Sequence, residues 1–300
     1  MKTEVSTSAG THLLVGCGYT GARLARRLAA LGPVLGLVRS EASAAALAAA
    51  GIPARVLDLD RPGPFDPPGD LASVVYLAPP PSDGEGDPRL RRFLEALSSV
   101  RPQALVYLST TGVYGDTGGR PVDEASSAVP RDDASRRRLA AEGLASTWCG
   151  AHGVRCVILR VAGIYGPGRL PLERLRAGEP VLRTEDSGPG NRIFVDDLVA
   201  ACEAALDRPL SGVVNVGDGD FRSLGAYLER VAQLAGLPAP RRITLDEARR
   251  ELSPAMLAYA TARRRVLSRR LTEELGVRPL ALDEGILVSL RQMGLSTAAR

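Results

Sequence analysis

Three glycines near the amino terminus have the spacing of a phosphate-binding turn. Gly16, Gly18 and Gly21 lie in the segment Gly-Cys-Gly-Tyr-Thr-Gly, which follows the strand-like run 12–15 and precedes leucines at helical spacing. Between a buried strand and a helix, such a turn points unpaired backbone N–H groups at a phosphate. Gly16 would permit the tight turn, Gly18 the approach of a pyrophosphate and Gly21 close packing of the helix. The segment predicts dinucleotide binding; a glycine-rich turn without a ligand is the alternative.

The end of the next apolar run, residues 34–38, bears on which dinucleotide binds. An acidic residue there hydrogen-bonds the ribose 2′-hydroxyl of NAD, whereas a basic one accommodates the 2′-phosphate of NADP. Arg39 and Ser40 follow the run, and a guanidinium matches phosphate geometry. We therefore expect NADP rather than NAD, with a solvent-facing Arg39 as the alternative. Asp58, after the next expected strand, either hydrogen-bonds the adenine amino group or only completes a turn.

Strand and helix patterns alternate over the first half of the chain. Further strands are expected at 54–57, 73–78, 104–109 and 154–160, and helices at 41–50, 89–100 and 132–149. Parallel strands that are buried on both faces have continuous apolar sequences, as these mostly do. The β-α-β-α-β order predicts an α/β fold, a Rossmann doubly wound parallel sheet.

The alternation ends after Tyr165, where turn residues and a short helical stretch replace it. We expect the chain to return to the sheet over 193–216, through helix 198–206 and strand 213–216. The remainder is helical and polar, with helices expected at 224–234, 246–252, 269–275 and 284–293. The predicted division is a dinucleotide-binding domain, residues 11–165 and 193–216, and a smaller, mostly helical C-terminal substrate-binding region, residues 166–192 and 217–295.

Composition argues against several other classes of protein. The chain has 300 residues, 45% of them apolar, and a net charge of only +4, so a nucleic-acid partner has little support. Its four cysteines and two histidines form no ligand cluster, and no metal site is expected. Met1–Gly10 lacks the apolar stretch of a signal peptide, and no uncharged run of about 18 residues suggests a membrane span. We expect a cytoplasmic protein with reduced thiols.

Four segments together carry a family resemblance. They are the glycine motif, Y-L-S-T-T-G-V-Y-G at 107–115, L-R-V-A-G-I-Y-G-P-G-R at 159–169 and R-I-F-V-D-D at 192–197. On these segments the chain, over roughly residues 13–293, resembles the extended and atypical short-chain dehydrogenase/reductases, also called the NAD-dependent epimerase/dehydratase family. Further expected cofactor contacts are Tyr19, Thr20, Ala78, Pro79, Gly163 and Ile164.

The resemblance implies a catalytic hydroxyl at Thr110, which would hydrogen-bond the reacting oxygen; a loop hydroxyl that bonds local backbone is the alternative. In the family a Tyr-x-x-x-Lys pair on the next helix acts as acid and base. Aligned through Glu142, that helix has Arg138 at the lysine position and Ala134 at the tyrosine position. Arg138 can bind the nicotinamide ribose but does not readily release a proton. Its alternative role is an ion pair with Glu142.

The absence of the family tyrosine leaves the proton donor open. Tyr114, close in sequence to Thr110, is one candidate, although the resemblance also allows it to line or underlie the pocket. Tyr165, in the loop expected to face the nicotinamide and substrate, is the other. Arg192 is expected to bind the diphosphate of a nucleotide sugar, or to pair with the aspartates at 196–197.

The pattern favours an NADP-dependent reductase or epimerase-like enzyme acting on a small polar or nucleotide-linked carbonyl or hydroxyl compound. Because Ala134 has no acidic proton, a non-catalytic NAD(P)-binding sensor or regulatory module is the rival hypothesis. A nucleotide-sugar epimerase with an unusual acid or base ranks third. Thr111 and Gly112 stand where the family's dehydratases carry an acidic pair, which disfavours dehydration. A homodimer through helices 89–100 and 132–149 is the arrangement typical of the family.

Overall fold

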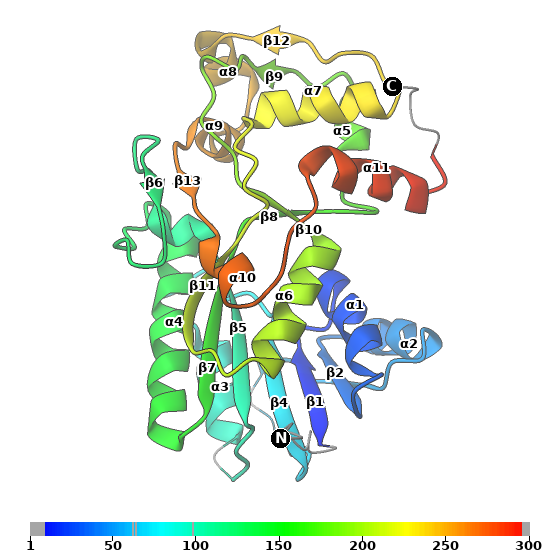
Figure 1. Cartoon of the computed structure of the whole chain (residues 1–300), viewed down its shortest axis with the longest axis vertical. Coiled ribbons are helices and arrows are strands. Elements are labelled where there is room, and N and C mark those ends of the chain that lie inside the picture. The colour runs from blue at the N-terminus through cyan, green and yellow to red at the C-terminus, as the bar shows by residue number, and fades with distance from the viewer. Residues whose placement is uncertain (1–9, 62, 64, 98, 296–300) are drawn as a thin grey trace.

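A parallel sheet forms the centre of the protein. The computed structural model describes residues 10–61, 63, 65–97 and 99–295, and within them seven strands pair in the order β11-β7-β5-β4-β1-β2-β3 (Figure 1). All neighbouring pairs are parallel. The strands are β1 (Thr11–Val15), β2 (Val34–Val38), β3 (Ala54–Val56), β4 (Leu71–Tyr76), β5 (Ala104–Thr110), β7 (Arg155–Val161) and β11 (Gly212–Val216). The Rossmann-like α/β fold expected from the sequence is confirmed.

Helices cover both faces of this sheet. Their bounds are α1 (Tyr19–Leu28), α2 (Glu41–Ala49), α3 (Pro88–Ala96), α4 (Asp133–His152) and α6 (Val195–Asp207). Successive strand residues point to opposite faces, so Leu14 packs with Leu24 of α1 and Leu198 of α6. Leu13 packs instead with Phe93 of α3 and the buried face of α4. The continuous apolar character of the strands follows from this two-sided burial.

Several element ends differ from the sequence expectation for local reasons. β2 and α7 (Leu224–Leu234) have the expected bounds. Helix α4 runs on to His152, beyond the expected end, and stops where Gly153 adopts φ +68° in the left-handed region, a common helix terminator. Helix α3 ends at Ala96, and residue 98 of the longer expected helix lies outside the described residues.

The predicted return of the chain to the main sheet over 193–216 is made by its last strand, β11, whereas the start of that segment pairs elsewhere. Strand β10 (Arg192–Phe194) pairs with β8 (Gly163–Tyr165) in a separate two-stranded parallel sheet. Strand β7 ends at Val161, and β8 begins at Gly163. Both β8 and β10 therefore lie beyond the carboxyl ends of the main-sheet strands (Figure 1). The chain rejoins the main sheet only at β11.

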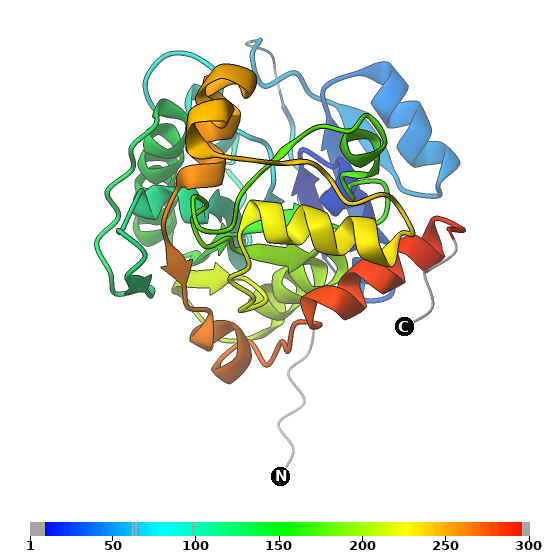
Figure 2. The same cartoon turned by 90° about the horizontal axis from the view of Figure 1, so that it is seen from above.

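Smaller elements lie over the carboxyl ends of the main strands (Figures 1 and 2). Helices α7 and α11 (Leu282–Gln292) lie side by side and enclose an apolar cluster around Tyr165 and Phe194. Helix α9 (Pro254–Thr261) was not expected, although Ser253 caps it and proline occupies its first turn, a recognisable start signal. The other elements are η1 (Thr111–Tyr114), β6 (Pro121–Val122), α5 (Leu172–Arg176), β9 (Val181–Leu182), β12 (Arg242–Ile243), α8 (Leu245–Glu251), β13 (Arg265–Val266) and α10 (Arg269–Glu273).

Membrane-spanning helices and metal-ligand clusters are both absent from the described residues. No helix among them has both the length and the apolar character needed to cross a bilayer. The same residues contain no group of three or more His, Cys, Asp or Glu side chains placed to hold a metal ion. Residues 1–9, which include most of the polar segment Met1–Gly10, lie outside the described part.

Candidate functional site

The three motif glycines have different structural requirements. Gly16 has φ +82°, and a Cβ there would lie 2.7 Å from the backbone nitrogen of Ala78. A Cβ on Gly21 would lie 3.3 Å from Sγ of Cys17. At Gly18 the nearest atom to an added Cβ is 4.0 Å away. Packing therefore requires glycine at 16 and favours it at 21, whereas an added Cβ at Gly18 has no closer neighbour, and the binding of a pyrophosphate there stays a prediction.

A cavity of about 310 Å³ adjoins the glycine turn. Five expected cofactor residues line it: Gly16, Arg39, Asp58, Ala78 and Pro79. Arg89 also lines this cavity, although it was not among the residues expected from the sequence. Its guanidinium donates two 2.6 Å hydrogen bonds to Asp60, and this partner lowers the pKa of Asp60. Asp60 thus neutralises one arginine of the cavity wall.

Arg39 and its neighbours at the ends of β2 and β3 have separate local roles. The Arg39 side chain is exposed at the rim of the cavity, where a 2′-phosphate could reach it. The Ser40 hydroxyl accepts a 3.3 Å hydrogen bond from the Ser43 backbone N–H and caps α2. Asp58 accepts one of 3.0 Å from the Asp60 N–H, so it completes a turn while facing the cavity. Binding of adenine by Asp58 stays a prediction.

Tyr19 connects the glycine turn to the segment after β8. Its hydroxyl donates a 3.0 Å hydrogen bond to the carbonyl of Pro167. The guanidinium carbons of Arg23 and Arg169 lie 4.0 and 4.1 Å from the ring centre, within the range of cation–π attraction. Thr20 is buried in the first turn of α1. Tyr19 therefore covers the start of the helix, and its contact with a pyrophosphate stays a prediction.

Thr110, Ala134 and Arg138 lie around one cavity of about 360 Å³, together with Pro79. The Thr110 oxygen accepts a 3.1 Å hydrogen bond from the Gly112 N–H, so its own proton remains available for another acceptor. Arg138 donates to the backbone carbonyl of Leu108 on the same strand. Ala134 contributes only a methyl group. Thr110 and the two helix positions aligned with the family's tyrosine and lysine, Ala134 and Arg138, thus line the same cavity.

Arg138 does not pair with Glu142, so its expected alternative role is wrong. Glu142 instead lies in a buried ion pair, with Oε2 2.8 Å from Nη2 of Arg160, and the two side chains are only 5% and 7% exposed. Ser109 donates a further hydrogen bond to this carboxylate. Ser109 and Arg160 are partners in the β5–β7 register, which explains why both reach Glu142.

Tyr114 does not reach either of the cavities that Thr110 lines. It is 2% exposed, and its hydroxyl donates a 2.9 Å hydrogen bond to Asn215. The Arg160 guanidinium carbon lies 4.8 Å from its ring centre, and burial raises the pKa of its phenol. These contacts contradict its expected role as proton donor, because the hydroxyl belongs to the buried network around Arg160.

Tyr165 is also buried rather than presented to a substrate. It is 2% exposed, and its ring centre lies 5.7 Å from that of Phe194 and 6.2 Å from that of Tyr227. A Cβ on Gly285 would lie 2.2 Å from its hydroxyl. The expected roles of Tyr165 in proton transfer and substrate binding are therefore wrong, because α11 packs directly over it.

Arg192 lines a third cavity, of about 150 Å³, and two of its guanidinium N–H groups already have acceptors. Nη1 donates to the carbonyl of Arg222 at 2.9 Å and Nη2 to that of Ser223 at 3.4 Å. Its guanidinium carbon lies 4.2 Å above the Tyr227 ring. Arg192 is also only 4% exposed, and its binding of a diphosphate stays a prediction. Residues that line this cavity include Thr110, Thr111, Gly163, Asn191, Arg192, Tyr259 and Arg264.

The alternative role of Arg192, an ion pair with Asp196 or Asp197, is not found in the structure. Asp196 lies 3.8 Å from Arg23, and Asp197 accepts a 2.9 Å hydrogen bond from the Leu280 N–H; neither pairs with Arg192. Ile164, an expected cofactor contact, packs between two apolar clusters, whereas Gly163 does line the third cavity. Three residues of this cavity were not expected from the sequence, because none of them belongs to a motif: Asn191, Tyr259 and Arg264.

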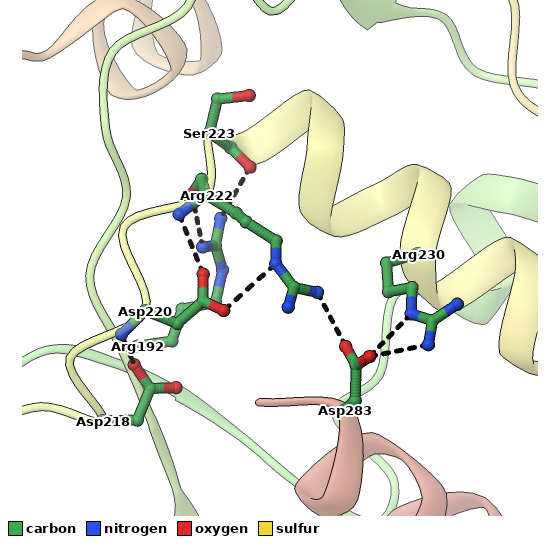
Figure 3. A network of polar contacts seen from close by, with 7 residues as sticks. All are labelled: Arg192, Asp218, Asp220, Arg222, Ser223, Arg230 and Asp283. Carbon is green, nitrogen blue, oxygen red and sulfur yellow. Dashed lines mark hydrogen bonds and ion pairs between the residues drawn. The ribbon is translucent and has the colours of Figure 1, made fainter. Parts of the chain in front are cut away.

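Asp218 is a buried carboxyl beside Arg192 (Figure 3). One of its oxygens accepts a 2.9 Å hydrogen bond from the Asp220 N–H, and the other has no partner among the described residues. Desolvation raises the pKa of Asp218 to about 7. Arg222 pairs with Asp220 and also with Asp283, which in turn pairs with Arg230 (Figure 3).

The raised pKa of Asp218 predicts how stability changes with pH. Between about pH 4 and 7 the folded state retains a proton that the unfolded chain has lost, so the free energy of unfolding should fall as pH rises. The slope reaches at most about 1.4 kcal/mol per pH unit. Urea unfolding at a series of pH values measures it. Asp218→Asn should remove this component, and an unchanged slope in that variant would contradict the assignment.

The doubly wound sheet with a glycine turn at its first crossover defines a protein of the Rossmann class. The family model described as NAD dependent epimerase/dehydratase family matches residues 90–217. A functionally unknown conserved protein from Silicibacter pomeroyi DSS has a similar structure at 30% sequence identity and TM-score 0.82, covering 94% of this chain and 99% of that one. The chain belongs to the NAD-dependent epimerase/dehydratase family.

Two further proteins are similar to this chain. Protein YeeZ of Escherichia coli (strain K12) is 27% identical over 78% of this chain and 87% of its own length. UDP-glucuronic acid 4-epimerase from Bacillus cereus, solved in complex with NAD, is 18% identical, with a TM-score of 0.74 over 94% of this chain and 99% of that chain. At this identity the second likeness shows the fold alone.

Proposed function

We propose that this protein is an NADP-dependent oxidoreductase of the extended short-chain dehydrogenase type, which reduces a carbonyl group of a small polar or nucleotide-linked compound. The observation that supports the proposal is that three neighbouring cavities share lining residues. Pro79 lines both the cavity at Arg39 and the one at Arg138, and Thr110 lines both the latter and the one at Tyr259. A dinucleotide that follows this path from the glycine turn would bring its nicotinamide to Thr110.

The residues along the path have distinct roles in the proposal. When bound, the dinucleotide supplies hydride chemistry that no side chain offers. The amides at Gly16–Gly21 hold the pyrophosphate at the start of α1. Thr110, whose oxygen already accepts from Gly112, donates its proton in a hydrogen bond to the substrate oxygen and polarises the carbonyl. Arg138, held by the Leu108 carbonyl, adds positive charge beside it.

The choice of NADP over NAD rests on Arg39. The B. cereus epimerase was solved with NAD, but here the position after β2 is an exposed arginine on the wall of the first cavity. Arg39→Ala should weaken NADPH binding by roughly 10- to 100-fold, as expected for loss of a charge-assisted hydrogen bond. NADH binding should change little. Fluorescence titrations with both nucleotides measure the difference, and equal effects on both would remove the 2′-phosphate assignment.

The rival proposal is a dinucleotide-binding sensor or regulatory module without turnover, which the methyl group of Ala134 favours. A nucleotide-sugar epimerase is a third candidate, although its transient ketone requires the same missing acid and base. Binding of NADPH, followed by its absorbance against a panel of aldehydes, ketones and keto-sugar nucleotides, separates the first two. Consumption supports the reductase, binding without consumption supports the module, and absence of binding contradicts both. A homodimer through α3 and α4, which lie on the same face, stays a prediction.

A further inference from the structure

The proposed reduction lacks an evident proton donor, because Ala134 has no hydroxyl and the phenols of Tyr114 and Tyr165 are buried. Helix α9 brings another phenol to the site. Tyr259 is 52% exposed and lines the cavity that Thr110 also borders. We infer that Tyr259 of the C-terminal region supplies the proton to the reacting oxygen, in place of the tyrosine missing from α4. This inference rests on the proposed function.

The position of the Tyr259 hydroxyl follows from a contact with Gly163. A Cβ on Gly163 would lie 3.3 Å from that oxygen, so the hydroxyl lies against the backbone that leaves β7. Thr110, at the end of β5, is paired in register with Val161, two residues before Gly163. Thr110 thus stands at the end of β5, the Tyr259 hydroxyl lies beside the chain that leaves the neighbouring strand β7, and both residues line the same cavity.

Backbone and amide contacts hold the carboxyl end of α9 at this place. The Gly188 N–H donates a 3.0 Å hydrogen bond to the carbonyl of Ala260. The Asn191 side chain donates one of 3.0 Å to the carbonyl of Arg264 and accepts one of 2.8 Å from the N–H of Val266. The chain that directly follows Tyr259 is thus tied to the loop that precedes β10.

Arg264 places a positive charge on the same cavity wall. It lines the cavity with Tyr259, and its Nη1 donates a 2.9 Å hydrogen bond to the carbonyl of Gly115. Desolvation lowers the pKa of Arg264, whereas negative charge at Tyr259 opposes this shift, and a guanidinium remains protonated near neutral pH. A fixed cation beside the site stabilises an anion that forms there without having to reorganise. The phenolate left after proton transfer is such an anion.

In the inferred step, the carbonyl carbon receives a hydride from the reduced nicotinamide dinucleotide. The C=O π bond breaks, and its electron pair moves to oxygen. That oxygen takes the proton of Tyr259, so the carbonyl compound becomes an alcohol and the dinucleotide is oxidised. The tyrosinate then takes a proton from water, which the half-exposed side chain can reach.

The decisive variant is Tyr259→Phe, measured with a carbonyl compound that the panel shows to be reduced. General acid catalysis contributes about 10²- to 10⁴-fold, so kcat should fall by about 100-fold or more while NADPH affinity stays within about 2-fold. Adding Ala134→Tyr to this variant returns a phenol to the cavity of Thr110 and should restore part of kcat. A kcat within about 3-fold of the parent, or a loss found in Tyr114→Phe instead, would overturn the inference.

A second measurement does not depend on turnover. Protein labelled with 3-fluorotyrosine gives fluorine NMR signals, and the Tyr259 signal is identified by its loss in Tyr259→Phe. Addition of NADPH should shift that signal, because Tyr259 adjoins the proposed nicotinamide position. If NADPH binds but the signal does not move, Tyr259 is not at the reaction site and the proposed function can still stand. If NADPH does not bind at all, the proposed function itself fails.

Discussion

Gly18→Val is expected to lower NADPH affinity by more than 100-fold while the protein stays folded. The nearest atom to a Cβ at this position is 4.0 Å away, so the Cβ itself meets no protein atom, and we expect the valine methyl groups to extend into the space that the pyrophosphate would occupy. The cofactor would lose its close approach to the amides of α1, which carry much of the phosphate binding. Fluorescence titration measures affinity, and circular dichroism during heating measures stability.

Gly16→Val provides the contrast to this variant. Its Cβ would lie 2.7 Å from the Ala78 nitrogen, at φ +82°, where an L residue is strained by about 1–3 kcal/mol even before the clash. It should therefore lower the melting temperature, which Gly18→Val should not. If Gly18→Val bound NADPH as tightly as the parent protein, the glycine turn would not be the phosphate site.

Glu142→Ala is expected to cost about 3–5 kcal/mol of unfolding free energy. The substitution leaves Arg160, only 7% exposed, without its carboxylate, and it removes the acceptor of the Ser109 hydroxyl. A buried charge that loses its partner costs more than the pair contributed, since desolvation is no longer offset. Urea denaturation at neutral pH measures the change.

Two comparisons separate the buried pair from a general effect on α4. Asp133→Asn, at the exposed start of the same helix, removes an ion pair with Arg136 and should leave the unfolding midpoint unchanged. Glu142→Leu combined with Arg160→Met removes both charges and should be less destabilising than Glu142→Ala alone. A loss below about 1 kcal/mol in Glu142→Ala would show that water reaches Arg160, contrary to the structure.

The positions that the sequence analysis missed share a physical cause. Arg160, Ser109 and Asn215 come together only through the registers of β5, β7 and β11. No spacing along the chain marks such a row, whereas Ser253 and Pro254 did mark the start of α9 and could have been used. Tyr114 was misjudged because closeness to Thr110 in sequence does not decide which way the 3₁₀ turn points its side chain.

The order of the main-sheet strands and the glycine turn could be predicted from the sequence. These depend on local patterns, namely continuous apolar runs, helical spacing and a residue without a Cβ where the backbone needs φ +82°. Which tyrosine lines a cavity with Thr110 followed only from the packing of the whole chain, which buries Tyr114 and Tyr165 and leaves Tyr259 half exposed. Segments far apart in the chain meet at that cavity, and their meeting depends on long-range contacts that no local pattern encodes.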